Sequence, residues 1–414
     1  MKVLHVCTEA QLGGAGIAAY RLHKGLRSLN IDSMMLVNKQ ALREDGIHGP
    51  SNTADKMAAR LVPVLDRIPG YFSALPADRT SASWMPNRLP GRINAIKPDI
   101  LNLHWVNDGF MRIETLPHLK QPIVWTLHDM WAFSGGEHYV GDNRRYKEGY
   151  TRQNKPTAET GLDINRWIWN RKRKAWANIR NLVIATPSQW LANCARESVL
   201  FENHRVEVLP NGIDPERFHP MDHSVAREIL GLPKNKKLIL FGAFSATSDK
   251  RKGFHLLVET LKKLEAKANP DEYELVIVGA SSLDESFHTK SHCLGRLNDE
   301  ISMALVYAAA DVFVAPSLED NLPNTVLESL ACGTPVVAFN IGGMPDMVSH
   351  EKNGFLARGF DTDELAAGLQ WILDDEQRWK SLSQEARKTI MDSFTLECAA
   401  NRYRDIYDDI LRSA

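Results

Sequence analysis

The sequence is poor in cysteine and has no long apolar run. It contains five cysteines, an odd number, and no two of them are spaced as CxxC. These are Cys7, Cys194, Cys293, Cys332 and Cys398. Because most of them sit inside apolar runs, we expect reduced core thiols in a cytosolic protein. No stretch reaches the roughly 18 apolar residues that a membrane-spanning helix needs, so we expect no transmembrane segment.

Net charge is also nearly absent. The chain has 50 lysines and arginines against 51 aspartates and glutamates, which gives a formal net charge of -1. This balance gives no electrostatic reason to expect a nucleic-acid partner, so we expect none. The first ten residues carry one lysine and a short apolar run interrupted by His5, Thr8 and Glu9. This is a strand pattern, and it predicts no secretion signal.

Length and composition predict a globular protein of two domains. At 414 residues the chain exceeds the usual size of a single core. Short apolar runs alternate with amphipathic segments, which is typical of an α/β fold with parallel sheets. The expected strands lie at 3–8, 31–39, 98–105, 122–129, 181–186, 236–242, 273–278, 311–315 and 335–339. Loops and short helices are expected over 41–93.

The stretch 311–348 reads as strand, loop, helix and strand. An apolar run ends at Ala315, and an amphipathic segment follows from Asn324 to Cys332. Asn324 is predicted to cap this helix, and Gly333 with Pro335 to end it. Such a unit implies a parallel sheet with a right-handed crossover, and a ligand at the carboxyl ends of the strands.

Two carboxylates of this stretch, Asp320 and Glu328, are separated by seven residues. Asp320 lies in the loop, and Glu328 lies one turn into the helix on the same face as Asn324. Both can point into one crevice, where they would accept hydrogen bonds from sugar hydroxyls. The backbone from Leu322 to Thr325, at the helix N-terminus, is suited to a phosphate. The same spacing also fits a solvated loop acid and a polar helix position.

Two glycine-bearing turns follow other expected strands. The basic run 250–252 precedes Gly253 and an amphipathic helix, a pattern that by itself usually marks solvated surface. Gly13 and Gly14 open the helix after the first strand. There they allow the backbone to approach a ligand, although close packing of helix on strand explains them equally well.

Histidines end two of the expected strands. His104 and His128 are therefore candidates to approach a ligand, although a histidine at a strand end is often a packed or surface residue. His138 stands alone in a segment without cysteines, so it predicts no metal site.

A basic helix is expected over 164–180. Its stripe consists of Trp169, Lys172, Arg173, Trp176 and Arg180. Tryptophan and basic residues on one face can indicate a helix that meets an anionic membrane surface. The alternative is that the tryptophans pack inward while the basic groups extend into water.

The stretch 311–348 resembles the donor-site signature of retaining glycosyltransferases of family 4, which have the GT-B architecture. The residues that match are Pro316, Ser317, Glu328, Ala331, Gly333, Pro335, Val336, Val337, Gly342 and Gly343. The first acid of that signature is usually glutamate, and here it is Asp320, with Glu319 one register away. The resemblance covers nearly the whole chain and is strongest over 235–350.

The resemblance implies an α/β GT-B fold, in which two Rossmann-like domains with parallel sheets face each other across a cleft. It places an N-terminal acceptor-side domain at 1–206 and a nucleotide-sugar donor domain at 207–395. Residues 396–414 would form a C-terminal helix that returns to the N-terminal domain.

Site roles follow from the same resemblance. Catalytic roles fall on His128, which would face the reacting sugar, and on Asp320, Lys252 and Arg251. The donor nucleotide sugar would contact Gly13, Gly14, Arg251, Lys252, Asn321, Leu322, Asn324, Thr325 and Glu328. Within this set, Lys252 and Arg251 would hold the diphosphate and Glu328 the ribose. His104 and Asp129 would lie on the acceptor side.

The implied activity is a metal-independent hexosyl transfer without a cofactor. A sugar would move from a UDP- or GDP-sugar to a hydroxyl of a saccharide or lipid-linked saccharide, as in exopolysaccharide, O-antigen or capsule biosynthesis. The reaction would be cytoplasmic, at the inner face of the plasma membrane if 164–180 contacts it. Two alternatives stay open, namely a sugar-nucleotide epimerase of the same fold and an inactive sugar-nucleotide-binding protein.

Overall fold

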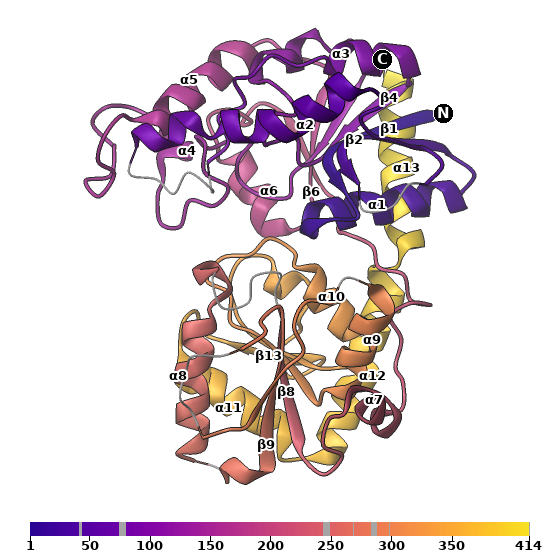
Figure 1. Cartoon of the computed structure of the whole chain (residues 1–414), viewed down its shortest axis with the longest axis vertical. Helices are drawn as coiled ribbons and strands as arrows, with labels where there is room; N and C mark the ends of the chain where they lie inside the picture. Colours follow the sequence, from indigo (N-terminus) through magenta and orange to yellow (C-terminus); the bar gives the residue numbers. More distant parts are fainter. Residues whose placement is uncertain are drawn as a thin grey trace. The chain divides into compact units, whose positions relative to one another are not determined.

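The chain forms two compact units, which are described separately (Figure 1). The computed structural model describes residues 1–40, 44–73, 80–242, 249–267, 269–282, 288–297 and 299–413. Unit 1 comprises Met1–Pro210 together with Ala399–Ala414, and unit 2 comprises Asn211–Cys398. The boundaries expected from the sequence lie a few residues before these two division points.

Unit 1 is built on a parallel sheet of seven strands in the order β3-β2-β1-β4-β5-β6-β7. The strands are β1 (Lys2–Ala10), β2 (Asp32–Gln40), β3 (Ile47–His48), β4 (Ile100–Leu103), β5 (Ile123–Thr126), β6 (Leu182–Thr186) and β7 (Arg205–Val208). The helices are α1 (Gly13–Ser28), α2 (Thr53–Asp66), η1 (Ile68–Phe72), α3 (Leu89–Ile96), η3 (Ile113–His118), α4 (Arg145–Glu148), α5 (Ile164–Trp176) and α6 (Gln189–Arg196).

Unit 2 is built on a parallel sheet of six strands in the order β10-β9-β8-β11-β12-β13. The strands are β8 (Lys237–Gly242), β9 (Tyr273–Val278), β10 (Ser291–Cys293), β11 (Val312–Ala315), β12 (Val336–Phe339) and β13 (Gly354–Ala357). The helices are α7 (His223–Leu230), η4 (Lys250–Lys252), α8 (Phe254–Glu265), η5 (Pro270–Glu272), α9 (Glu300–Ala309), α10 (Asn324–Ala331), η6 (Met344–Asp346), α11 (Thr362–Leu373) and α12 (Glu376–Ser393). The last helix, α13 (Leu396–Ser413), belongs to unit 1 from Ala399 on.

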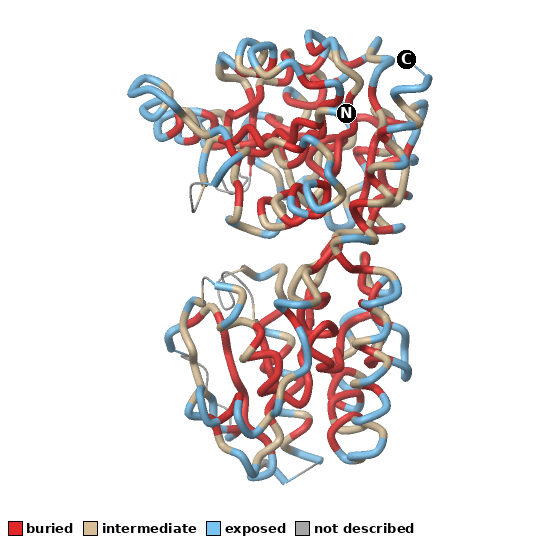
Figure 2. The backbone as a smooth tube through the Cα atoms, turned by 90° about the vertical axis from the view of Figure 1, so that its right-hand side faces the viewer, coloured by how far each residue is buried: buried red, intermediate tan, exposed pale blue. Residues whose placement is uncertain are grey.

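The predicted α/β class with two Rossmann-like parallel sheets is confirmed. In each unit the central strands are buried along their whole length and are largely apolar, as expected for strands covered by helices on both faces. Figure 2 shows these strands as the buried interior of each unit, with the exposed backbone in loops and outer helices.

Each sheet has one place where the strand order reverses. In unit 1 this place lies between β1 and β4, and in unit 2 between β8 and β11. In open α/β sheets, ligands bind outside the carboxyl ends of the strands at such a reversal. Each unit therefore has a defined position at which to look for a site.

The predicted basic helix is α5, and its stripe packs into unit 1. Trp169, Lys172 and Trp176 are all buried, whereas Arg173 and Arg180 are exposed. The inward-packing alternative is therefore correct for the tryptophans, and the membrane-facing interpretation of this stripe is wrong. Lys172 does not extend into water, because its Nζ donates to the backbone carbonyls of Trp131, Ser134 and Gly135.

The cysteines and helices agree with two further expectations. None of the five cysteines is paired in a disulfide. Within the described ranges, no helix is both long and apolar enough to span a bilayer.

Candidate functional site

Gly253 brings a basic turn against the loop that follows β11. Its φ is 74°, and a Cβ at this position would lie 1.8 Å from the backbone oxygen of Pro316. Only glycine fits this left-handed conformation and this close approach. The preceding turn, η4, is capped by Asp249, whose Oδ1 accepts a hydrogen bond from the Arg251 amide at 3.1 Å. The Leu318 amide in turn donates to the Arg251 carbonyl at 2.8 Å.

Asp320 lies at the centre of the charges in this turn. Its Oδ2 is 2.5 Å from Lys252 Nζ and 3.4 Å from the guanidinium of Arg251, and it accepts a hydrogen bond from Ser317 Oγ at 3.3 Å. Burial raises the pKa of Asp320, but Lys252 and Arg251 together outweigh that effect and hold the pKa below its ordinary value. The carboxylate is therefore ionised at neutral pH.

The backbone of Asp320 is fixed from the opposite side by the glycine turn after β12. Gly342 has a φ of 53°, and a Cβ there would lie 2.1 Å from the Asp320 carbonyl oxygen. The Gly343 amide donates to that same oxygen at 3.1 Å. The backbone at position 320 consequently has no room to retreat from Lys252.

The N-terminus of α10 lies beside this charge cluster. The structure corrects the predicted cap, because Pro323 occupies the N-cap position and Asn324 is the first helical residue. Proline fixes a φ of -64° in extended backbone, which starts the helix without a side-chain cap. No side chain therefore occupies the positive end of the helix dipole from the cap position.

A pocket opens at the reversal of the unit 2 sheet, at the carboxyl ends of β8 and β11. Its walls are formed by Phe241, Gly242, Lys252, Phe313, Val314, Ala315, Pro316, Ser317, Asp320, Pro323, Thr325 and Met344. Lys252, Asp320 and Thr325 thus line one pocket, and Glu328 is not among its lining residues. Residues 243–248, which follow β8, lie outside the described residues.

The remaining predicted donor-side residues of unit 2 lie along α10 and the loop before it. Glu328 is buried, and its Oε2 accepts a hydrogen bond from the hydroxyl of Tyr307 at 3.0 Å. Asn324 Oδ1 is 3.5 Å from Asn211 Nδ2. Asn321 and Leu322 are buried, and the Asn321 amide donates to Asp320 Oδ1 at 3.2 Å.

In unit 1, three histidines form a row across adjacent strands. His5 Nδ1 lies 3.0 Å from His104 Nε2, and His104 Nδ1 lies 3.1 Å from His128 Nε2. The row crosses β1 and the ends of β4 and β5, at the reversal of the sheet. Both ring nitrogens of His104 are used inside the protein, so neither remains to contact an acceptor.

These three histidines are neutral at physiological pH. Burial lowers the pKa of His128 to about 4, and it lowers the pKa of His5 and His104 well below the ordinary value. A neutral imidazole has one donor nitrogen and one acceptor nitrogen. The tautomers of the three rings are therefore coupled along the row.

Asp129 follows His128 and belongs to a second set of contacts. Its Oδ2 is 2.6 Å from His138 Nδ1 and 3.1 Å from Trp105 Nε1, and its Oδ1 accepts from the Trp131 amide at 2.9 Å. Burial raises the pKa of Asp129, and the contact with His138 more than offsets this, so the pKa is lowered. The carboxylate is thus ionised but largely satisfied within the protein.

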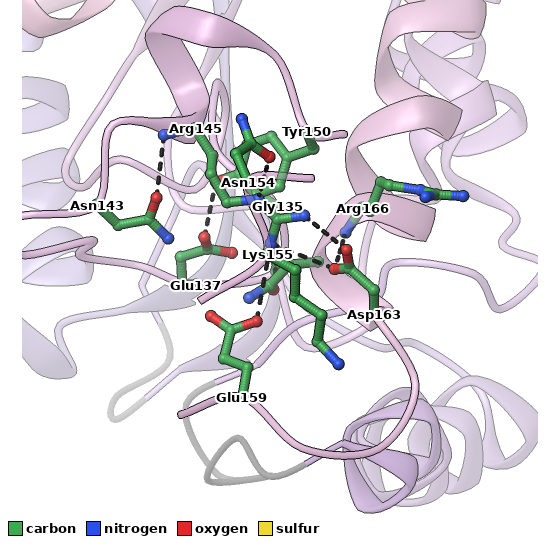
Figure 3. A network of polar contacts seen from close by, with 12 residues as sticks. Gly135, Glu137, Asn143, Arg145, Tyr150, Asn154, Lys155, Glu159, Asp163 and Arg166 are labelled. Atoms are coloured by element: carbon green, nitrogen blue, oxygen red, sulfur yellow. Dashed lines mark hydrogen bonds and ion pairs between the residues drawn. The ribbon is translucent and has the colours of Figure 1, made fainter. Parts of the chain in front are cut away.

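A polar network supports the segment that contains His138 (Figure 3). Arg145 forms an ion pair with Asp163 at 2.6 Å and approaches Glu159 at 3.7 Å. Tyr150 donates to Glu137 at 2.7 Å and accepts from the Gly135 amide at 2.9 Å. Together with Lys172 beneath it, this network fixes the chain from 131 to 163 on the core of unit 1. In the described part of the chain, no group of three His, Cys, Asp or Glu side chains is arranged to hold a metal.

Gly13 and Gly14 begin α1 at the carboxyl end of β1. Gly13 has a φ of 61°, and a Cβ at Gly14 would meet no atom within 4 Å. The packing of α1 on β1 therefore does not require a glycine at position 14. The close approach instead occurs at Gly16, where a Cβ would lie 2.8 Å from the Glu9 carbonyl oxygen.

The structure brings the predicted residues together in two groups. Lys252, Arg251 and Asp320 make direct contact in unit 2, and His104 and His128 make direct contact in unit 1. Sequence reasoning missed His5 and Tyr307. A signal for His5 exists, because each of the three strands carries a Leu-His pair, at 4–5, 103–104 and 127–128. We find no local signal for Tyr307, which lies 21 residues from its partner.

Two family models match the chain. Residues 12–217 match "Glycosyltransferase Family 4", and residues 235–375 match "Glycosyl transferases group 1". Each half of the chain therefore matches a glycosyltransferase family model. The second match contains the basic turn, Asp320 and α10.

Similar proteins fall in the same class. A D-inositol 3-phosphate glycosyltransferase of Catenulispora acidiphila is 30% identical over 198 residues, which are 44% of this chain and 45% of that protein. The chain thus matches about half the length of this curated relative. Among solved structures, sucrose-phosphate synthase from Thermosynechococcus elongatus has a TM-score of 0.71 at 17% identity, with 100% of both chains covered. Anabaena HepE in complex with UDP-glucose has a TM-score of 0.63 at 17% identity, covering 99% of this chain and 100% of that one. These two structures show that the chain has the GT-B fold.

Proposed function

We propose that this chain is a retaining glycosyltransferase that moves a sugar from a nucleoside-diphosphate sugar to a hydroxyl of a saccharide or lipid-linked saccharide. The observation that carries the proposal is the contact of Lys252 with Asp320 inside the pocket of unit 2, beside the N-terminus of α10. A cation, a helix N-terminus and a carboxylate that share one pocket suit a phosphate joined to a sugar.

The reaction breaks the bond between the anomeric carbon and the oxygen of the β-phosphate. The electron pair of that bond stays on the diphosphate, so negative charge develops there. In this proposal Lys252, Arg251 and the amides at the start of α10 stabilise this charge. The acceptor hydroxyl oxygen forms the new bond to the anomeric carbon, and its proton passes to the departing diphosphate. For the configuration to be retained, the acceptor must attack on the face from which the diphosphate leaves.

The two carboxylates divide the donor between them in this proposal. Asp320 orients the sugar. Because Asp320 is also paired with Lys252, the bound diphosphate has to share the Lys252 ammonium group with this carboxylate. Glu328, held by Tyr307, receives the ribose hydroxyls. His128 of unit 1 contacts the sugar as a neutral donor or acceptor, because its lowered pKa keeps it uncharged. Gly13 and Gly14 offer backbone amides to the same donor, and Asp129 lies on the acceptor side.

The donor is a UDP- or GDP-sugar, and we propose that no metal takes part, since Lys252 and Arg251 supply the positive charge. The unpaired cysteines suit a reducing compartment, which supports a cytoplasmic reaction. We assign the chain to the assembly of a cell-surface polysaccharide such as an exopolysaccharide, O-antigen or capsule. This assignment is supported by the resemblance alone.

Incubation with a panel of nucleotide sugars tests the proposal. Release of UDP or GDP, by transfer to added acceptors or by slow hydrolysis, is the expected result. Conversion of the donor to its epimer would instead show an epimerase of the same fold. Binding of a nucleotide sugar without any turnover would show a binding protein, and no binding at all would overturn the assignment of the pocket.

A further inference from the structure

Large apolar side chains are exposed along one stripe of α2 and onto η1. Their exposed fractions are Met57 57%, Leu61 55%, Val64 65%, Leu65 37%, Ile68 39%, Tyr71 74% and Phe72 60%. On α2 the spacing of i, i+4, i+7 and i+8 places Met57, Leu61, Val64 and Leu65 on one helix face. A run of this length on one face is unusual for a surface that only meets water.

The opposite face of α2 holds the helix on unit 1. Ala59, Pro63 and Asp66 are buried there. Asp66 accepts hydrogen bonds from Ser81 Oγ at 2.8 Å and from the Trp84 amide at 3.3 Å. Since this face anchors the helix, the exposed stripe is not needed to attach α2 to the core.

Basic side chains run beside the stripe. Lys56, Arg60 and Arg67 follow a spacing that sets them between the buried face and the apolar stripe. Lys56 and Arg60 are exposed, and among the described residues neither side chain has an ion-pair partner. Arg67 has a long contact with Asp108, at 3.5 Å. This is the position from which long basic side chains reach lipid headgroups.

Carboxylates are kept away from the stripe. The two acids of α2 are Asp55 and Asp66, and Asp66 is buried. Asp55 lies on the far side of the helix, 3.9 Å from the guanidinium of Arg88. Between 53 and 72, therefore, no carboxylate would repel an anionic surface from the stripe.

The apolar surface continues onto the segment before α5 and onto the first turn of α5. The Leu162 amide donates to the Phe72 carbonyl at 2.9 Å, and Ser73 bridges to Gly161, so these segments lie side by side. Leu162 and Trp167 are exposed, and the guanidinium of Arg171 lies 4.8 Å from the centre of the Trp167 ring. Tyrosine and tryptophan with neighbouring arginine are typical of the boundary between headgroups and acyl chains.

We propose that this surface, formed by the stripe of α2, by η1, Leu162 and Trp167 with the flanking Lys56, Arg60 and Arg67, docks on an anionic lipid bilayer. Apolar side chains enter the acyl boundary, and the basic groups contact the headgroups. An anionic bilayer is favoured over a protein partner because the flanking groups Lys56, Arg60 and Arg67 are all basic and no carboxylate of 53–72 faces the stripe. The proposal places membrane contact on α2 instead of the buried stripe of α5, and it does not depend on the proposed reaction.

Vesicle binding by the full chain tests this proposal without any sugar donor. Wild-type protein is sedimented with vesicles of phosphatidylcholine and with vesicles that also contain phosphatidylglycerol, at low and high salt. Met57→Gln/Leu61→Gln removes two exposed apolar groups of the stripe. Val225→Gln/Ile229→Gln is its matched control, because these two residues of α7 have the same spacing and similar exposure, 55% and 62%. Lys56→Gln/Arg60→Gln removes two charges, and Lys380→Gln/Lys388→Gln removes the same charge from α12.

The expected result is salt-sensitive binding to the anionic vesicles alone. Each α2 variant should bind at least about tenfold more weakly, while both controls bind like the wild type. Circular dichroism checks that every variant is folded. The proposal is overturned if the wild type ignores the vesicles or if the α2 variants bind unchanged. It is also overturned if light scattering shows a wild-type dimer that Met57→Gln/Leu61→Gln dissociates, since a second copy would then cover the stripe.

Discussion

The polar groups at the two sheet reversals differ in kind. In unit 2 they are charged, because Lys252 and Arg251 surround an ionised Asp320. In unit 1 they are neutral, because burial lowers the pKa of all three histidines in the row. The sheets are similar, so the difference comes from the side chains at the strand ends.

This contrast suggests a division of labour. A charged cluster stabilises negative charge that appears on a leaving diphosphate, whereas a neutral row can only exchange hydrogen bonds with a sugar. The contrast also has a structural side. The charges of unit 2 compensate each other, whereas the histidines of unit 1 are held uncharged mainly by burial and are therefore sensitive to acid.

Lys252→Ala should have the largest effect on turnover. The variant loses the cation nearest to Asp320, and loss of one preorganised group of this kind typically lowers kcat by about a hundredfold. Lys262→Ala, which removes an exposed lysine from α8, is the control. Donor turnover is measured by release of UDP or GDP, and unchanged kinetics would remove Lys252 from the site.

Asp320→Asn should lower transfer by at least about tenfold without weakening nucleotide binding. Asparagine keeps the size of the side chain, but it loses the charge that orients the sugar, and Lys252 becomes freer to meet a phosphate. Asp320→Glu should also impair transfer, because the backbone held by Gly342 and Gly343 leaves no room for a further methylene. If Asp320→Asn transferred sugar like the wild type, the assignment would be wrong and Glu319 would be the next acid to test.

Acid should weaken unit 1 before it affects the charge cluster of unit 2. The pKa of His128 falls from 6.5 to about 4 on folding, so between these values the unfolded chain binds more protons. The contribution of His128 to the free energy of unfolding is therefore complete above pH 6.5, and it declines as the pH falls toward 4. Asp320, with a pKa below its ordinary value of 3.8, stays ionised in that window.

Amide hydrogen exchange at pH 7 and pH 5 measures this difference. Protection of β1, β4 and β5, corrected for the intrinsic rate, should fall at least about tenfold more than protection of β11 and β12. His104→Gln removes one titrating ring from the row and should reduce the drop. Equal loss of protection in both sheets would show that the histidines do not control the acid response.

Chelation should have the smallest effect. If Lys252 and Arg251 provide the positive charge at the diphosphate, EDTA should leave donor turnover unchanged. Full loss of activity that magnesium or manganese restores would contradict the proposed mechanism and would assign part of the charge stabilisation to a metal ion.

Much of the fold was predictable because it rests on local patterns. Apolar runs marked the strands that flank both reversals, and the strand, loop and helix from 311 to 331 was expected from spacing alone. The capping preference of one residue gave a wrong prediction for the N-cap of α10. Asn324 is a good capping residue, yet Pro323 takes that position because its fixed φ already suits the start of a helix.

The site was predictable only as far as its residues are close in sequence or at strand ends. The pairing of Lys252 with Asp320 joins residues 68 apart, and it depends on the approach of Gly253 to Pro316. His5 lies in the middle of a strand, where its neighbour depends on the strand order. Lys172 looked like a surface cation, but backbone carbonyls of the 131–135 segment surround it. Such contacts depend on tertiary structure and leave no pattern in a short window.

The most direct test of the central claim is a calorimetric titration of the wild type, Lys252→Ala and Lys262→Ala with UDP, GDP and the matching nucleosides. If the diphosphate binds in the pocket of unit 2, one of the two nucleotides should bind the wild type and Lys262→Ala equally. It should bind Lys252→Ala at least about tenfold more weakly, while the nucleoside shows no such difference. Equal binding of that nucleotide to all three proteins, or no binding of either nucleotide to the wild type, would contradict the account.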